Sequence, residues 1–139
     1  MSDFLPLFYT RRSIRKFVDQ PVEVKKVEAI LKAGLLAPSG KAVYPCEFII
    51  VDDPDVLGII AKAKKHGATF VAKAPVAIVV VADTSKTDVW IEDASIVSSF
   101  MLIEAENQGL GCCWIQMRLR GTDDGKPVTD NLRQILNLK

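Results

Sequence analysis

The sequence has 139 residues, of which 49% are hydrophobic and 25% charged, and its 18 basic and 17 acidic residues give a net charge of +1. These values predict one globular domain over residues 1–139 and give no general attraction to nucleic acid or to a membrane. No segment resembles a signal peptide, and the longest apolar run, 76–82, is too short to span a bilayer, so we expect a cytoplasmic protein.

The first half of the chain predicts two helices, then a strand, then a third helix. A helix is expected over 3–9 with Ser2 as its N-cap, and a second helix is expected to begin at Pro21 and to end before Pro38-Ser39-Gly40. The apolar run 46–51 predicts a strand. Asp53-Pro54 then predicts a capped helix that continues to about Lys65.

The second half predicts two further strands and two helices. Residues 76–82 form an unbroken β-branched run that predicts a strand buried on both faces. A long helix follows over 89–108, a strand over 112–117, and a last helix that Thr129 caps. The apolar stripe of the long helix is wider than one sheet face needs, which favours a central core helix or a helix that also packs against a second subunit.

The cysteines and the histidine argue against two kinds of site. The three cysteines include the adjacent pair Cys112-Cys113, which forms no disulfide framework and agrees with a reducing compartment. A single histidine and the absence of Cys-x-x-Cys spacing argue against a structural zinc site, so we expect no metal. Neighbouring residues of a strand point to opposite faces, so we interpret the cysteine pair as small buried residues.

The stretch 11–17 has the sequence RRSIRKF and places four cations and a hydroxyl in seven residues. Arginine side chains bind phosphate as planar forks, and serine adds a hydroxyl donor, so one interpretation is a phosphate cradle. The other interpretation is a solvated basic loop or a localisation patch. The segment by itself favours the second.

Together with several later segments, this stretch resembles the opening of the nitroreductase family of FMN-dependent NAD(P)H oxidoreductases. The other matching segments occur in the order of the family: 21–22 (PV), 37–40 (APSG), 73–78 (KAPVAI), 92–95 (EDAS) and 109–115 (GLGCCWI). The resemblance implies an α+β fold with a mixed β-sheet flanked by helices, and a homodimer with FMN at its interface.

The resemblance also implies the residues that bind the cofactor. Arg11, Arg12 and Ser13 would meet its phosphate and ribityl oxygens, and Arg15 would lie near N1 and O2 of the ring. Pro38, Ser39 and Gly40 would line the ring, from the partner subunit. The backbone at Gly111 and Cys112 would approach its other side.

FMN-dependent transfer of hydride from NAD(P)H to nitroaromatic, quinone or flavin acceptors is the implied activity, with flavin N5 and no side chain carrying the chemistry. Because the sequence contains no Gly-x-Gly-x-x-Gly, NAD(P)H would be a transient co-substrate that shares its pocket with the acceptor, which predicts ping-pong kinetics. One alternative keeps the fold for reductive dehalogenation or flavin breakdown. Another is a dimer that binds flavin or phosphate ligands without turnover.

The sequence departs from the family pattern at two places. Many relatives carry Asn and Gln soon after the Pro-Ser-Gly element, whereas Lys41 and residues 42–45 stand here, so Lys41 is a candidate replacement for a flavin contact. Relatives also continue into a further strand and a basic tail, which this sequence does not contain. In similar proteins that tail often helps to bind the FMN phosphate.

Overall fold

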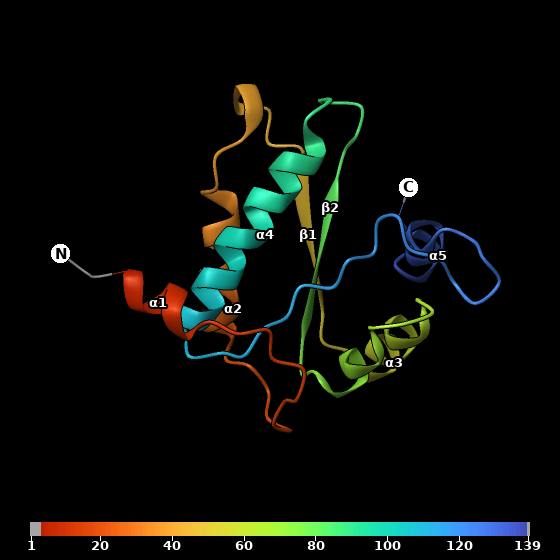
Figure 1. The fold of residues 1–139 in the computed structure, drawn as a ribbon, viewed down its shortest axis with the longest axis horizontal. Helices are drawn as coiled ribbons and strands as arrows, with labels where there is room; N and C mark the ends of the chain where they lie inside the picture. Colours follow the sequence, from red (N-terminus) through yellow and green to blue (C-terminus); the bar gives the residue numbers. More distant parts are fainter. Residues whose placement is uncertain (1–3, 139) are drawn as a thin grey trace. The chain divides into compact units, whose positions relative to one another are not determined.

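A computed structural model describes residues 4–138 (Figure 1). Its helices and strands follow the order α1 (Leu5–Thr10), α2 (Val24–Leu35), β1 (Cys46–Val51), α3 (Pro54–Lys62), β2 (Ala77–Ala82), α4 (Trp90–Asn107) and α5 (Val128–Ile135). Two short 3₁₀ helices, Gly40–Ala42 and Thr69–Lys73, lie between them. The expected N-cap Ser2 is outside the described residues.

The chain divides into two compact units, each made of separate segments. The first unit comprises Met1–Ile14, Val22–Ile50 and Ile78–Trp114, and the second comprises Arg15–Pro21, Val51–Ala77 and Ile115–Lys139. The prediction of a single domain over 1–139 stays a prediction.

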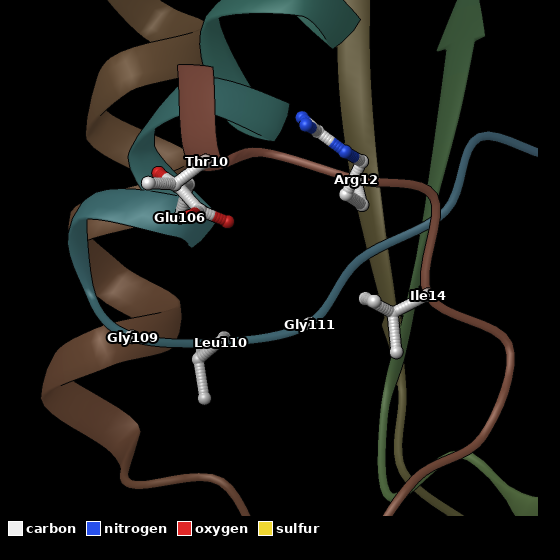
Figure 2. Close-up of a pocket in the computed structure, with 7 residues that line it drawn as sticks. All are labelled: Thr10, Arg12, Ile14, Glu106, Gly109, Leu110 and Gly111. Carbon is white, nitrogen blue, oxygen red and sulfur yellow. The ribbon is translucent and has the colours of Figure 1, made fainter. Parts of the chain in front are cut away.

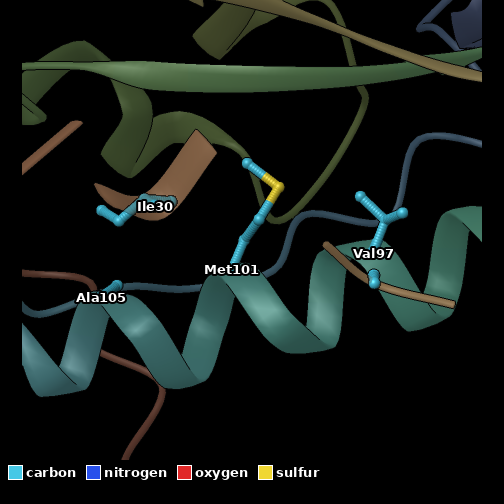
Figure 3. Close-up of a cluster of buried hydrophobic side chains, with 5 residues drawn as sticks. Ile30, Val97, Met101 and Ala105 are labelled. Atoms are coloured by element: carbon cyan, nitrogen blue, oxygen red, sulfur yellow. The ribbon is translucent and has the colours of Figure 1, made fainter. Parts of the chain in front are cut away.

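The core of the first unit lies between α2 and α4 and is shown in Figure 3. Five residues form its fully buried cluster: Ile30, Ala37, Val97, Met101 and Ala105. The last three are spaced by four residues and therefore share one face of α4. Gly34 of α2 permits the close approach, because a Cβ there would lie 2.9 Å from Phe48 Cζ and 3.0 Å from Met101 Cγ. The 3.6-residue pattern of the two helices thus builds this core.

The sheet within residues 4–138 consists of β1 and β2. The backbone N–H of Asp83, just after β2, donates to the carbonyl of Pro45, just before β1, at 2.9 Å, so the two strands are antiparallel. Alternate residues of the strands pack on the α2–α4 core: Cys46, Phe48, Ile78 and Val80. Of the expected mixed sheet, the described residues form this antiparallel pair and one isolated parallel bridge, between Ser13 and Cys112.

Two strand predictions differ from the structure. Every residue of β2 is half-buried, so the strand is not fully buried on both faces as predicted. A β-branched run satisfies strand propensity without requiring complete burial. Residues 112–117 form no strand, because their only ladder contact among the described residues is the bridge at Cys112. A strand needs a neighbour along its whole length to pair its backbone groups.

The observed helix boundaries agree with some of the predicted starts and ends and differ from others. Asp53 caps α3, its Oδ1 accepting from the N–H groups of Asp55 and Val56, as predicted. The helix nevertheless ends at Lys62 rather than about Lys65. α2 begins at Val24 rather than at Pro21, and Thr129 lies inside α5, whose N-cap is Pro127.

The second unit has its own buried residues. Leu57, Ile60 and Ala61 of α3 are buried, as are Val71 of the 3₁₀ helix Thr69–Lys73 and Val128 and Leu132 of α5. The 3₁₀ helix Thr69–Lys73 follows Ala68, which is fully buried. No helix in the described part of the chain combines the length and hydrophobicity needed to cross a bilayer.

Candidate cofactor site

The basic loop and the segment after α4 are joined in the first unit by the parallel bridge between Ser13 and Cys112. The backbone N–H of Ile14 donates to the carbonyl of Cys112 at 3.0 Å. Gly111 makes this approach possible, because a Cβ there would lie 2.8 Å from Ile14 Cγ2 (Figure 2). The structure therefore brings Arg11, Ser13, Gly111 and Cys112 together, although they are a hundred residues apart in sequence.

The two arginines before Ser13 have different surroundings. Arg11 is the C-cap residue of α1, and its charge lies close enough to Cys112 to act on the thiol. Arg12 is exposed, and its Nη1 donates to the carbonyls of Tyr9 and Arg11, both at 2.8 Å. Arg12 thus holds the end of α1, and it keeps further N–H donors for an anion.

A pocket of about 310 Å³ opens beside this junction (Figure 2). Its lining combines Thr10, Arg12 and Ile14 of the basic loop with Glu106, Gly109, Leu110 and Gly111 at the end of α4. Because Gly109 and Gly111 have no side chains, a flat group can approach the backbone closely on this side of the pocket. Cation, hydroxyl and accessible backbone are the groups that a phosphorylated ring compound needs.

The cysteines near the site are not activated. Burial raises the pKa of the Cys112 thiol, and the smaller opposing effects include the charge of Arg11. Burial, with the charge of Asp93 second, raises the pKa of the Cys46 thiol as well. Both thiols therefore stay protonated at neutral pH, and a protonated thiol is a poor nucleophile.

Pro38, Ser39 and Gly40 lie at the other end of α4, where Asp93 holds them. Asp93 is only 2% exposed. Its Oδ2 accepts from the Ser39 hydroxyl at 2.9 Å, and its Oδ1 accepts from the N–H of Gly40 at 2.9 Å. The Ser39 oxygen in turn accepts from the N–H of Tyr44 at 2.9 Å. The Ser39 hydroxyl therefore donates its only proton to Asp93.

The segment that follows is conformationally strained. Lys41, Ala42 and Tyr44 have φ values of 53°, 54° and 52°, a region that non-glycine residues rarely adopt. Lys41 and Tyr44 are exposed. Such strain persists only where surrounding contacts fix the backbone, and here the Asp93–Ser39–Tyr44 hydrogen bonds do so. The exposed Lys41 and Tyr44 side chains are therefore carried by backbone that these hydrogen bonds fix.

Asp93 is the site residue that sequence reasoning did not single out. In the sequence it stands only as one member of the motif at 92–95. A helix-forming pattern with an acidic residue in its first turn is common, and nothing in the sequence shows that this carboxylate is buried against residues 39 and 40. The available signal was the spacing of four residues to Val97, Met101 and Ala105, which puts the carboxylate on an otherwise apolar face of the helix.

Arg15 belongs to the second unit. Its guanidinium carbon lies 5.9 Å from the centre of the Phe70 ring, which in turn stacks at 6.4 Å, tilted, against Phe17. This places the cation on an aromatic face, a favourable arrangement. Among residues 4–138, no three or more His, Cys, Asp or Glu side chains gather as potential metal ligands.

The sequence matches the pattern of a known protein family over most of its length. The pattern of the family described as "Nitroreductase family" matches residues 9–68 and 56–139. This chain belongs to the nitroreductase family. The α+β fold and the class of FMN-dependent oxidoreductase expected from the motifs are thereby confirmed at the level of the family.

Individual members of the family show how far the similarity extends. The chain is 36% identical over 119 residues to a protein from Archaeoglobus fulgidus assigned as an NADH dehydrogenase/NAD(P)H nitroreductase, covering 83% of this chain and 68% of the relative. It is 38% identical over 115 residues to a protein from Methanothermobacter thermautotrophicus with the same assignment, covering 81% and 60%. The chain thus spans about two thirds or less of these relatives.

A solved structure supports the fold over nearly the whole chain. The FMN-dependent nitroreductase from Clostridium difficile R20291 superimposes with a TM-score of 0.95 at 46% identity, covering 97% of this chain and 79% of that one. At this similarity the backbone of the nitroreductase fold is shared.

Proposed function

We propose that this nitroreductase-family chain binds FMN and reduces nitroaromatic, quinone or flavin acceptors with hydride from NAD(P)H, in a ping-pong order. The observation that carries the proposal is the Ser13–Cys112 bridge, which joins the basic loop to the glycine-rich end of α4. Bound FMN would supply the hydride-accepting chemistry. The chain would supply binding, orientation and the electrostatic surroundings.

The residues at this junction fit the parts of FMN. Arg11, Arg12 and Ser13 offer charged and hydroxyl donors for a phosphate and its neighbouring oxygens. Gly111 and Cys112 present backbone to a ring edge. Arg15 is proposed as the cation near the pyrimidine side of the ring, where positive charge favours the reduced form.

We further propose that the site is shared by two copies of the chain. Asp93, which holds the Pro38–Gly40 loop, and Glu106, which lines the pocket, are thirteen residues apart on α4, about 20 Å along its axis. A ring that lies against Gly111 therefore does not reach Pro38 of the same chain. A second copy would bring Pro38, Ser39, Gly40 and Lys41 to the ring.

Exposed apolar side chains of the first unit support this dimer. They are Phe4, Leu5, Phe8, Tyr9, Leu35, Leu36, Ile91, Ile96 and Phe100. Ile96 and Phe100 are four residues apart and share a face of α4 that differs from its buried face. Monomeric proteins seldom leave so many large apolar residues on neighbouring elements in contact with water.

The test of the proposed function begins with the purified full chain and added FMN. We expect visible flavin absorbance after gel filtration and steady oxidation of NAD(P)H with a nitroaromatic or quinone acceptor. Initial rates measured against both substrates should give parallel double-reciprocal lines. A folded chain that binds FMN without turnover would instead support a flavin-binding dimer.

The bridge itself is tested by Gly111→Ala. The added methyl would lie 2.8 Å from Ile14 Cγ2 and push the basic loop away from Cys112. Displacing one charged hydrogen bond costs about 1.5–3 kcal/mol, so FMN affinity should fall roughly tenfold to a hundredfold. The matched control is Gly58→Ala, where an added Cβ meets nothing within 4 Å. Equal FMN affinity in the two variants would contradict this placement.

A further inference from the structure

The second unit contains a pair of aromatic rings with a cation on one of them. The ring of Phe70 lies 6.4 Å from the ring of Phe17 and is tilted by 42° to it, and the guanidinium carbon of Arg15 lies 5.9 Å from the centre of the Phe70 ring. All three residues belong to the same unit, although Phe70 follows Arg15 by more than fifty positions. The fold of this unit, and not a local motif, therefore places the cation on the ring.

The Phe70 ring is carried by a well-packed part of the unit. Phe70 belongs to the 3₁₀ helix Thr69–Lys73, and its neighbours Ala68 and Val71 are only 0% and 2% exposed. The N–H of Val71 donates to the carbonyl of Ala68 at 3.0 Å and so closes the turn that holds Phe70. This 3₁₀ helix packs against α3. Phe70 itself is half-buried, which leaves part of its ring accessible to Arg15.

The Arg15 side chain has few other contacts. It is exposed, and no hydrogen bond or ion pair of its guanidinium is described within residues 4–138. A cation over an aromatic face is attracted by the quadrupole of the ring, so the contact with Phe70 requires none of the N–H donors. The five donors of the guanidinium therefore stay available to an acceptor outside the chain.

The covalent chain brings Arg15 to the edge of the candidate cofactor site. The preceding residue, Ile14, lines the pocket there and donates its backbone N–H to the carbonyl of Cys112 at 3.0 Å. Consecutive Cα atoms are about 3.8 Å apart, so the Arg15 side chain starts one residue from this junction. From that point a long, exposed side chain adopts several staggered rotamers. The face of a fixed ring selects among them.

We propose that Phe70 is a positioning residue, whose ring holds the Arg15 guanidinium in the orientation that stabilises reduced flavin. The inference rests on the proposed function, in which Arg15 is the cation near the pyrimidine side of FMN. Positive charge at that place stabilises the anionic reduced ring more than the neutral oxidised ring. Phe70 therefore acts on the reduction potential of the flavin through Arg15.

The test measures the two-electron midpoint potential of FMN bound to the full chain, by equilibration with a reference dye. Phe70→Leu keeps an apolar side chain but removes the aromatic face. A cation–π contact at an exposed site corresponds to a factor of about two to five in an equilibrium constant. Affinity for reduced FMN should fall by this factor relative to oxidised FMN, which lowers the potential by about 10–20 mV. Phe70→Tyr keeps the face and should leave the potential unchanged.

A double-mutant cycle shows whether Phe70 acts through Arg15. Arg15→Gln by itself should lower the potential, because the cation is lost. In the Arg15→Gln background, Phe70→Leu should cause no further shift, since the contact that it removes is already absent. Lys16→Gln is the control for net charge, because Lys16 is an exposed cation at the next position. It should shift the potential less than Arg15→Gln does.

Phe48→Leu is the control for the loss of an aromatic side chain. Phe48 is half-buried, as Phe70 is, but packs on the α2–α4 core of the first unit. This variant should lower Tm and leave the potential of bound FMN unchanged. A purely structural role of Phe70 would give the same result in Phe70→Leu. Circular dichroism establishes that each variant is folded, and Phe70→Met repeats the test if Phe70→Leu does not fold.

The outcomes separate this inference from the proposed function. A chain that binds no FMN overturns the proposed function, and the role of Phe70 with it. A chain that binds FMN and oxidises NAD(P)H, with the same potential in Phe70→Leu as in the unaltered chain, overturns the role of Phe70 alone. A shift in Phe70→Leu that is equally large in the Arg15→Gln background also overturns it, because the ring would then act without Arg15.

Discussion

At the scale of single residues, the loop at Ser39 and Gly40 is determined by one buried carboxylate. Motif reasoning assigns both residues to the flavin, yet the Ser39 hydroxyl and the Gly40 N–H both donate to Asp93. Their first role is therefore to position the loop. The groups left for a ligand are the face of Pro38 and the exposed side chains of Lys41 and Tyr44, on backbone that the Asp93 contacts hold in a strained conformation.

Asp93→Asn tests this role. The amide matches the carboxylate in shape, but its NH₂ group would face one of the two donors and leave it unpaired in a buried position. The expected loss is about 1–3 kcal/mol of unfolding free energy. Amide hydrogen exchange at Tyr44 should accelerate, because Ser39 loses its anchor. The control is Glu92→Gln, an exposed acid one position earlier.

If hydrogen exchange at Tyr44 were equally slow in Asp93→Asn and in the unaltered chain, the loop would be held by other contacts.

At the scale of elements, side-chain caps were predictable where they act locally, and boundaries set by packing were not. Asp53 caps α3 through its own side chain, as the sequence indicates. Pro21 and Thr129 carry similar signals, but α2 begins at Val24 and α5 at Val128. The buried residues Ile30 and Gly34 of α2 and Val128 and Leu132 of α5 lie inside the observed bounds, and tertiary packing of such residues supplies most helix stability.

The turn 122–126 before α5 predicts a pH-dependent contribution to stability. The hydrogen bond from Thr122, followed by that from Lys126, lowers the pKa of Asp124 to about 2 from 3.8. A carboxylate with a lowered pKa stabilises the folded state above its ordinary pKa, and the contribution disappears as the pH falls through the folded value. Asp124→Asn should therefore lower Tm at pH 6, and its difference from the unaltered chain should shrink between about pH 4 and pH 2.

Thermal unfolding followed by circular dichroism over this pH range measures the difference. Asp123→Asn is the control, because Asp123 is exposed and no hydrogen bond or ion pair of its side chain is described within residues 4–138. A Tm difference that stayed constant from pH 6 to pH 2 would contradict the assigned role of Asp124.

At the scale of the whole molecule, α4 organises the first unit. One face packs on α2 through Val97, Met101 and Ala105, and its two ends hold the two candidate parts of the cofactor site. A further face keeps Ile96 and Phe100 exposed. The wide apolar stripe of α4 therefore divides into a buried face, which packs inside the chain, and an exposed face. The exposed face is available to a second copy of the chain.

Phe100→Glu tests the proposed dimer. The side chain is 43% exposed, so a carboxylate there is tolerated by the single chain but is costly in an apolar interface. Dimer content and FMN content should fall together, since a ligand that binds only the dimer stabilises it. Light scattering and flavin absorbance on the same dilution series measure both. A charge introduced at Val97 would not test the interface, because Val97 lies in the core of its own chain.

Ile59→Glu is the matched control, since Ile59 is similarly exposed at 52% but lies on α3. A folded Phe100→Glu monomer that retained FMN as tightly as the unaltered chain would rule out the shared site.

The sequence by itself determined the helices α3 and α4, the strands β1 and β2, the family and the basic loop. These follow from local periodicity, from a side-chain cap and from contiguous motifs, all of which are encoded by neighbouring residues. Only the tertiary structure decided that 112–117 forms a single bridge and that Asp93 holds Ser39 and Gly40. Each of these depends on which distant segments lie side by side, and neither spacing nor composition specifies that.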